Sequence, residues 1–209
     1  MNFTAEDLAA FDFPALHDRA LAEWYAEGEA PDFGPSEVEP AADVESVVLA
    51  QHFSNFKLWN LEDEARRRDV ADAYIAEIKR AIDARNQRRN DLIEVLDERL
   101  LDGLAGVDVS GAERHSETAG MIVDRLSILS LKVHHMAINA SRTDDKDLAA
   151  ECAKKLAVLS RQRTDLARCV AKLLADFAEG RRYFELYRQY KAYNDQRLNP
   201  ALAGRGTRG

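Results

Sequence analysis

The chain has 209 residues, of which 46% are hydrophobic and 32% charged, with a formal net charge of −8. This balance is that of a globular protein with a sizeable core, and the negative charge argues against general nucleic-acid binding, which needs a positive field. The acidic N-terminus lacks the apolar run of a signal peptide, and no stretch approaches the roughly 18 apolar residues of a membrane span, so we expect a cytoplasmic protein.

The first 41 residues predict two helices and a loop. Thr4 can cap a short opening helix, and Pro14 can start a longer one that continues to about Gly28. Three prolines and a glycine between Glu29 and Ala41 predict a loop.

The central region predicts two long helices before a loop and a third long helix after it. The first runs from about Asp43 to Arg67, and the second, with Asp69 as its cap, runs to about Leu101. Residues 102–116 contain three glycines and read as a loop. The third long helix then covers about residues 117–141.

The C-terminal third predicts two more helices and a tail. Thr143, Asp144 and Asp145 can begin a helix that ends near Gly180, and a last helix covers about 181–198. Residues 199–209 are rich in glycine and arginine, so we expect disorder there. Alternation of period two is absent, so no strand is predicted. The predicted fold class is therefore all-α, an antiparallel bundle of about five to six helices in one domain over residues 1–198.

The helix expected at 143–180 shows an ordinary core face. Its apolar residues recur at spacings of three, four and seven: Leu148, Cys152, Leu156, Leu159, Leu166, Val170, Leu173 and Phe177. Arg163 interrupts this stripe, and we predict that it turns inward and needs a carboxylate partner. Cys152 and Cys169 lie too far apart on one helix, roughly 25 Å, to form a disulfide, and we expect both to pack in the core.

Three of the predicted helices carry polar side chains on a face that a bundle normally makes apolar, and we call these positions the polar seam. The helix at 43–67 contributes Asn55, Trp59, Glu62 and Arg66, with Asp63 beside Glu62. The helix at 69–101 contributes Lys79, Asp83, Asn86, Asn90, Glu94 and Asp97, with Arg89 close by. The helix at 117–141 contributes Asp124, Ser127, Leu131 and His135.

Antiparallel neighbours would bring the members of the polar seam together. We expect Glu94 and Asp97 near Asp124, Asn86 and Asn90 near His135, and Arg66 near Lys79. Carboxylates that converge in a low-dielectric interior repel one another and need cations.

This chemistry suits an anionic small molecule such as a nucleotide sugar or sugar phosphate. In that hypothesis arginine and lysine meet phosphate, amides and Asp83 meet hydroxyls, and Trp59 stacks on a sugar or base. The binding residues are then Asn55, Trp59, Arg66, Lys79, Asp83, Asn86, Arg89 and Asn90. A Mg²⁺ or Mn²⁺ ion would take its ligands from Glu62, Asp63, Glu94, Asp97, Asp124 and His135.

Three other interpretations stay open. The stripes are equally those of solvated helix faces or a structural network of ion pairs. The Glu94-x-x-Asp97 spacing, with Glu62–Asp63 as a second half, is similar to that of metal-dependent nucleotide pyrophosphohydrolases. A buried polar interface can also fix helix register or a homo-oligomer, which would make this an assembly protein.

Three motifs in order resemble a bacterial family, the domain of unknown function numbered 4254. They are NFKLWNLEDEAR at 55–66, KRAIDARNQRRNDLIE at 79–94 and ETAGMIVDRLSILSLKVHHM at 117–136. Ala119 departs from the family's usual proline, and His134 stands where an aromatic residue is frequent. The resemblance covers roughly residues 45–140 and implies a helical protein without an established activity. Its members are often encoded beside glycosyltransferases of surface-polysaccharide pathways, which implies a glycosyltransferase partner and an accessory role.

Overall fold

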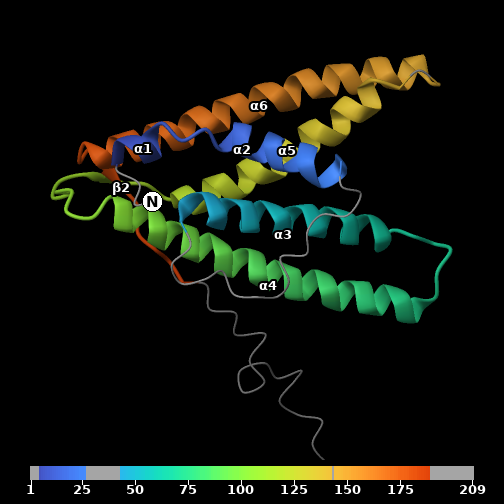
Figure 1. Ribbon diagram of the computed structural model, residues 1–209, viewed down its shortest axis with the longest axis horizontal. Helices are drawn as coiled ribbons and strands as arrows, with labels where there is room; N and C mark the ends of the chain where they lie inside the picture. The colour runs from blue at the N-terminus through green and yellow to red at the C-terminus, as the bar shows by residue number, and fades with distance from the viewer. Residues whose placement is uncertain (1–4, 27–42, 143, 189–209) are drawn as a thin grey trace, which may run out of the picture.

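The computed structural model describes residues 5–26, 43–142 and 144–188, and within them it is all-α apart from one pair of two-residue strands (Figure 1). The elements in chain order are α1 (Ala5–Ala9), α2 (Phe13–Ala26), α3 (Val44–Glu64), α4 (Asp72–Gly103), β1 (Glu113–Arg114), α5 (Ala119–Ala140), α6 (Lys146–Ala178) and β2 (Arg182–Tyr183). The predicted all-α class is confirmed. Thr4, Thr143, the whole loop expected at 29–41 and the tail at 199–209 lie outside the described residues.

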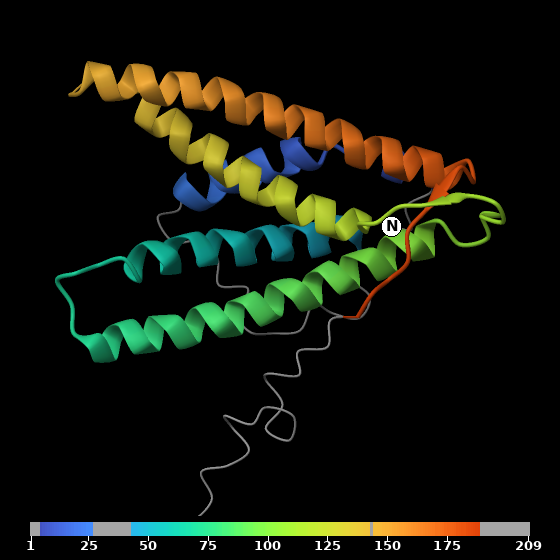
Figure 2. The same cartoon turned by 180° about the vertical axis from the view of Figure 1, so that it is seen from behind.

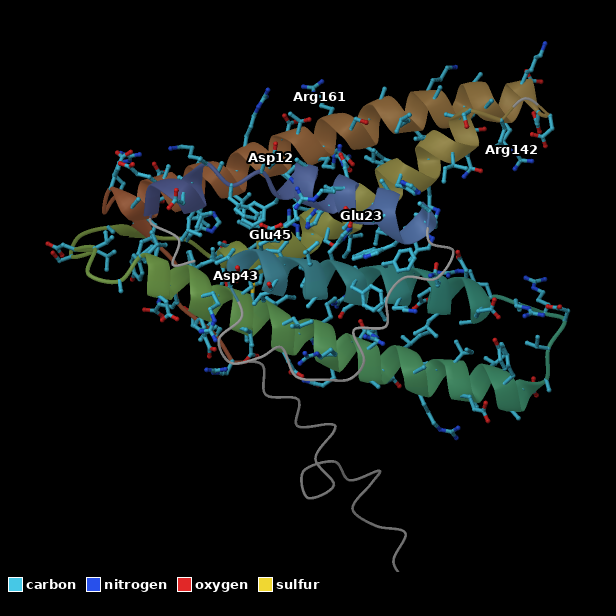
Figure 3. The ribbon with its side chains drawn as sticks, viewed as in Figure 1. Asp12, Glu23, Asp43, Glu45, Arg142 and Arg161 are labelled. Carbon is cyan, nitrogen blue, oxygen red and sulfur yellow. The ribbon has the colours of Figure 1, made fainter. Side chains whose placement is uncertain are left out.

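Side-chain caps set the starts of three long helices close to their predicted positions. Asp43 lies at the start of α3 (Figure 3), where its carboxylate accepts the Ser46 N–H at 3.0 Å. Thr118 caps α5 through the Met121 N–H at 3.2 Å, and Asp145 caps α6 through the Leu148 N–H at 2.9 Å. These bonds satisfy donors that the first turn of a helix leaves unpaired.

The predicted cap of α4 is wrong, and the helix starts two residues later than predicted. Ala71 stands at the N-cap and makes no side-chain cap. Asp69 instead accepts two hydrogen bonds from the Arg67 guanidinium, at 3.1 and 2.8 Å. Its charge is therefore engaged within the connection from α3, and helical geometry begins only at Asp72.

The long helices form two hairpins. α3 and α4 run back along each other, as do α5 and α6, and the two hairpins splay apart at the end where α6 begins (Figures 1 and 2). α2 packs mainly on α5, with further contacts to α3 and α6, and α1 lies against α6. None of the described helices combines the length and the apolarity needed to cross a membrane.

Two apolar clusters hold these elements together. The larger joins α4, α5 and α6 with α1 and the start of α3 through residues such as Leu96, Leu126 and Leu173. The smaller lies under α2, where Trp24 packs on Phe53 and Phe56. Each large side chain buried in this way stabilises the fold by roughly 1.5–3 kcal/mol.

The helix expected at 181–198 does not begin where it was predicted. After Gly180, which adopts a left-handed φ of 68°, residues 182–183 pair in parallel with residues 113–114. Arg181 donates to the buried Asp176 carboxylate, and the Phe184 ring packs edge-on against Phe177. These contacts draw the chain away from the α6 axis, and the rest of the expected helix after residue 188 lies outside the described residues.

The predicted inward turn of Arg163 is confirmed. Its guanidinium makes a two-pronged ion pair with Asp18 of α2, at 2.5 and 3.1 Å. The apolar stripe around it is unevenly buried: Val170, Leu173 and Phe177 near the end of α6 are buried, whereas Leu148 near its start is 38% exposed. Cys152 is buried as expected, but the expected burial of Cys169 is wrong: its thiol is exposed on a groove between α5 and α6.

Candidate functional site

A buried carboxylate organises the polar side chains between α3 and α5. Asp124 Oδ1 accepts hydrogen bonds from Asn55 Nδ2, at 2.9 Å, and from the Gln51 amide. Arg89 of α4 approaches the same oxygen, with its Nε at 3.8 Å. Burial raises the pKa of Asp124, while Arg89, Asn55 and Gln51 oppose that rise. The Asp124 carboxylate is thus an anionic acceptor that is already matched by donors from α3 and a cation from α4.

A serine of α5 extends this network deeper into the bundle. Ser127 Oγ accepts a hydrogen bond from Asn55 Nδ2 at 3.0 Å and lies 2.7 Å from His52 Nδ1. One turn further along α5, Ser130 Oγ lies 3.3 Å from His17 Nδ1. Successive turns of α5 therefore present small hydroxyls to polar side chains of α3 and α2.

Beside this network, α3, α4 and α5 enclose a pocket of about 340 Å³. A volume of this size suits a small ligand. α3 supplies most of its wall, α4 supplies a single arginine and α5 supplies two aliphatic side chains. The lining residues are Asn55, Leu58, Trp59, Glu62, Asp63, Arg66, Arg89, Ile128 and Leu131.

The aromatic wall of the pocket is held in place from behind. The His135 ring stacks on Trp59 with centroids 4.4 Å apart and planes inclined by 5°. Tyr25 Oη of α2 lies 3.0 Å from His135 Nε2, and the Tyr25 ring stacks on His134. Burial and the neighbouring His134 lower the pKa of His135, so this ring is neutral at neutral pH. The indole orientation is thus fixed by two helices other than its own.

The mouth of the pocket carries both signs of charge. Arg66 pairs with Glu62 at 3.3 Å and with Asp63 at 3.7 Å, and all three side chains are exposed. Arg89 is more enclosed, and its buried Nε–H makes no hydrogen bond with any described residue. A buried donor without an acceptor costs about 1–3 kcal/mol, which makes Arg89 the group most ready to donate a hydrogen bond to a ligand oxygen.

The structure brings together eight of the fourteen predicted site residues. Asn55, Trp59, Glu62, Asp63, Arg66 and Arg89 line the pocket, Asp124 binds Asn55 at its inner side, and His135 supports Trp59. The other six lie on α4 away from it. Lys79 and Asp83 form an exposed pair with each other, and Asn86 and Asn90 are half-buried outside the pocket lining.

Glu94 and Asp97 are the clearest departures from the predicted arrangement. Glu94 pairs with Arg188 at 3.2 Å, and buried Asp97 accepts the Gly120 N–H at 2.6 Å. Asp97 therefore neutralises the positive start of α5. The expected register between α4 and α5 is wrong, because Asp97 meets Gly120, whereas Asp124 meets Arg89.

The predicted six-residue metal site is not assembled. Across residues 5–26, 43–142 and 144–188, no group of three or more histidine, cysteine, aspartate or glutamate side chains is placed to hold a metal ion. The physical reason is that Glu94, Asp97 and Asp124 each have another partner on a different part of the bundle. The expected meeting of His135 with Asn86 and Asn90 is replaced by its stack on Trp59.

Several contributing residues were not singled out from the sequence. Gln51 and His52 extend the α3 face by one turn toward its start, at i−4 and i−3 from Asn55, and Ser130 lies at i+3 from Ser127, so helical spacing indicates all three. His17 and Tyr25 carry no such signal, because α2 meets α5 only in the tertiary structure.

Fold and site together define an all-helical protein with one mixed-charge, aromatic-walled pocket between three helices. The chain belongs to the family described as proteins of unknown function, DUF4254, which matches residues 45–186. No curated protein and no solved structure matches the chain. The family region extends beyond the resemblance at 45–140 to include α6 and β2, and it contains every residue that lines the pocket.

Proposed function

We propose that this protein binds a small anionic sugar derivative, a sugar phosphate or a nucleotide sugar, in the pocket between α3, α4 and α5. The observation that carries the proposal is Arg89, whose buried Nε–H lacks a partner among the described residues while its side chain lines the pocket. A phosphate oxygen would satisfy that donor with a charge-assisted hydrogen bond.

The remaining lining suits the sugar. An indole presents a flat apolar surface with a polar edge, and Trp59 is already oriented by His135. Asn55 and the carboxylates of Glu62 and Asp63 offer donors and acceptors for hydroxyl groups. Arg66 pairs with both carboxylates and offsets part of their charge, which lessens their repulsion of an anionic ligand.

The chain allows a direct optical test, because it contains only two tryptophans. Trp24 is buried on the inner face of α2, whereas Trp59 lines the pocket. In a Trp24→Phe background, all tryptophan fluorescence reports the pocket. We expect saturable quenching by glucose 1-phosphate or UDP-glucose, and weaker responses to free glucose and inorganic phosphate.

Two arginine variants separate specific binding from general charge effects. Arg89→Gln should weaken binding at least tenfold, since it removes the phosphate partner, equivalent to about 1.4 kcal/mol. Arg161→Gln is the matched control, because Arg161 lies on the outer surface of α6 with its side chain 86% exposed (Figure 3). Quenching that Arg89→Gln leaves unchanged would contradict the proposal.

Thermal unfolding provides the second readout. A ligand present at about 100 times its dissociation constant should add roughly 2.7 kcal/mol to the free energy of unfolding. If no sugar phosphate or nucleotide sugar stabilises the protein and pocket variants instead change its mass in solution, the assembly role replaces ligand binding. An accessory role toward a glycosyltransferase is part of the proposal and predicts that such an enzyme co-purifies with the native protein.

A further inference from the structure

Two fully buried histidines face each other across the contact between α2 and α3. His17 and His52 are both 0% exposed, and their ring centroids lie 4.3 Å apart. The Nδ1 atom of each contacts a serine of α5, Ser130 for His17 and Ser127 for His52. Neither Nε2 atom has a hydrogen-bond partner among the described residues.

The surrounding donors favour neutral rings. Asn55 Nδ2 donates to Ser127 Oγ, which leaves the serine hydroxyl hydrogen able to donate to His52 Nδ1. Arg163 Nη1 likewise lies 3.5 Å from Ser130 Oγ, leaving that hydroxyl hydrogen able to donate to His17 Nδ1. The serine hydroxyls can therefore satisfy an unprotonated Nδ1 on each ring, so a neutral imidazole fits both contacts without a second proton.

Among the residues that the structure describes, no carboxylate pairs with either ring. Arg163 of α6 faces His17 with its own positive charge, and the nearby Asp18 of α2 is already bound by Arg163. Asp124 of α5 reaches His52 only through Asn55 and Ser127. A second proton on either ring would therefore create an unpaired buried charge, and protons on both would place like charges 4.3 Å apart.

We propose that the His17–His52 pair is an acid-sensitive latch, which holds α2 on the bundle while both rings are neutral and releases α2 when they are protonated. Both rings would reach water together. Release of α2 removes His17 from the interior, and it also removes the Trp24 ring that packs on His52, because Trp24 belongs to α2. Release of α2 would also withdraw Tyr25 from His135. The latch does not depend on the proposed ligand.

The direction of the titration agrees with this geometry. Burial, followed by the neighbouring His52 and Arg163, lowers the pKa of His17 well below its usual value, and burial lowers the pKa of His52 to about 3. In the released state both return toward the ordinary value of about 6.5. The released state therefore binds more protons, so the latch is closed above about pH 6.5 and weakens as the pH falls below it. Two such histidines raise the equilibrium constant for release of α2 by roughly several hundred-fold between pH 7 and pH 5.

Hydrogen exchange of the full chain, read by mass spectrometry, tests the latch without any variant. Exchange of peptides from α2 and α4 is compared at pH 7.5, 6.0 and 5.0 after correction for intrinsic rates. We expect α2 to lose at least a hundredfold of its protection at pH 5.0 while α4 keeps its own. Retained protection of α2, or simultaneous loss in both helices, would overturn the proposal.

A substitution then assigns the effect to the pair. His17→Asn keeps an acceptor oxygen near the position of Nδ1 and removes one titrating group. Below about pH 6.5, the increase in α2 exchange for each unit of pH decrease should therefore be about tenfold smaller than in the wild type. His115→Asn is the control, because His115 lies in the connection before α5 and bonds the Glu117 carbonyl. Equal pH dependence in His17→Asn and the wild type would also rule out the latch.

Discussion

Trp59 and His135 lie face to face, with ring centroids 4.4 Å apart and planes inclined by 5°, and the Tyr25 hydroxyl lies 3.0 Å from the outer nitrogen of the imidazole. Three helices thereby fix one indole at the wall of the pocket. A rigid aromatic surface loses little conformational entropy when a ligand binds, which is the benefit of this arrangement.

Tyr25→Phe tests whether that support matters. The variant keeps the stack on His134 and removes the hydroxyl that meets His135. Because the residue is partly exposed, we expect the free energy of unfolding to fall by less than about 1 kcal/mol. The Trp59 emission in a Trp24→Phe background should nevertheless change, and ligand affinity should fall. An unchanged spectrum and affinity would show that the stack orients itself without α2.

Asp124→Ala should be among the most damaging single changes. It leaves Gln51 and Asn55 without their common acceptor and removes the carboxylate that pairs with the Arg89 cation. Removing one partner of a buried charged network costs about 3–5 kcal/mol, and urea unfolding measures it. Asp124→Asn keeps one acceptor oxygen and should cost clearly less. Equal losses in the two variants would mean that the negative charge, which both variants lack, determines stability, and not the acceptor oxygen that asparagine keeps.

Asp97→Asn should change how stability depends on pH. Burial raises the pKa of Asp97 to about 6, although Thr118 and the Gly120 N–H oppose the rise. The folded state therefore holds a proton that the unfolded state has released, and wild-type stability falls as the pH rises from about 3.8 through about 6. The variant lacks this loss, so its stability relative to the wild type should rise by about 2.4 kcal/mol between pH 4 and pH 7.

Urea unfolding at several pH values checks this prediction, with Asp102→Asn as the matched control on the same helix. Asp102 is largely exposed beside Arg99, so its substitution should leave the difference from the wild type nearly constant. A constant difference for Asp97→Asn as well would contradict the raised pKa.

Gly120→Ala should destabilise the contact between α4 and α5. A Cβ atom at this position would lie 2.7 Å from Asp97 Oδ1 and 2.8 Å from the Ile93 carbonyl oxygen. Overpacking of this kind typically costs about 1–3 kcal/mol, although alanine is the better helix former by itself. Chemical denaturation measures whether the free energy of unfolding falls or rises. A stabilised variant would show that α5 can move away from α4 without a loss of stability.

Local sequence patterns predicted most of the helices and most of the α3 wall of the pocket. Caps at Asp43 and Asp145 and the spacing of Asn55, Trp59 and Arg66 are local properties, because residues three or four apart share one face of a helix whatever surrounds it. The inward turn of Arg163 followed in the same way from a break in an apolar stripe.

Only the tertiary structure decided which faces meet. Polar residues on α4 repeat along the whole helix, so several registers against α5 satisfy the same pattern, and packing selected the one that places Asp97 at Gly120 and Arg89 at Asp124. That choice removed Glu94 and Asp97 from the pocket and brought in Ile128 and Leu131 of α5. The pairing of His17 with His52 likewise joins α2 to α3 through their packing on α5, because helical periodicity carries no information about partners distant in the chain.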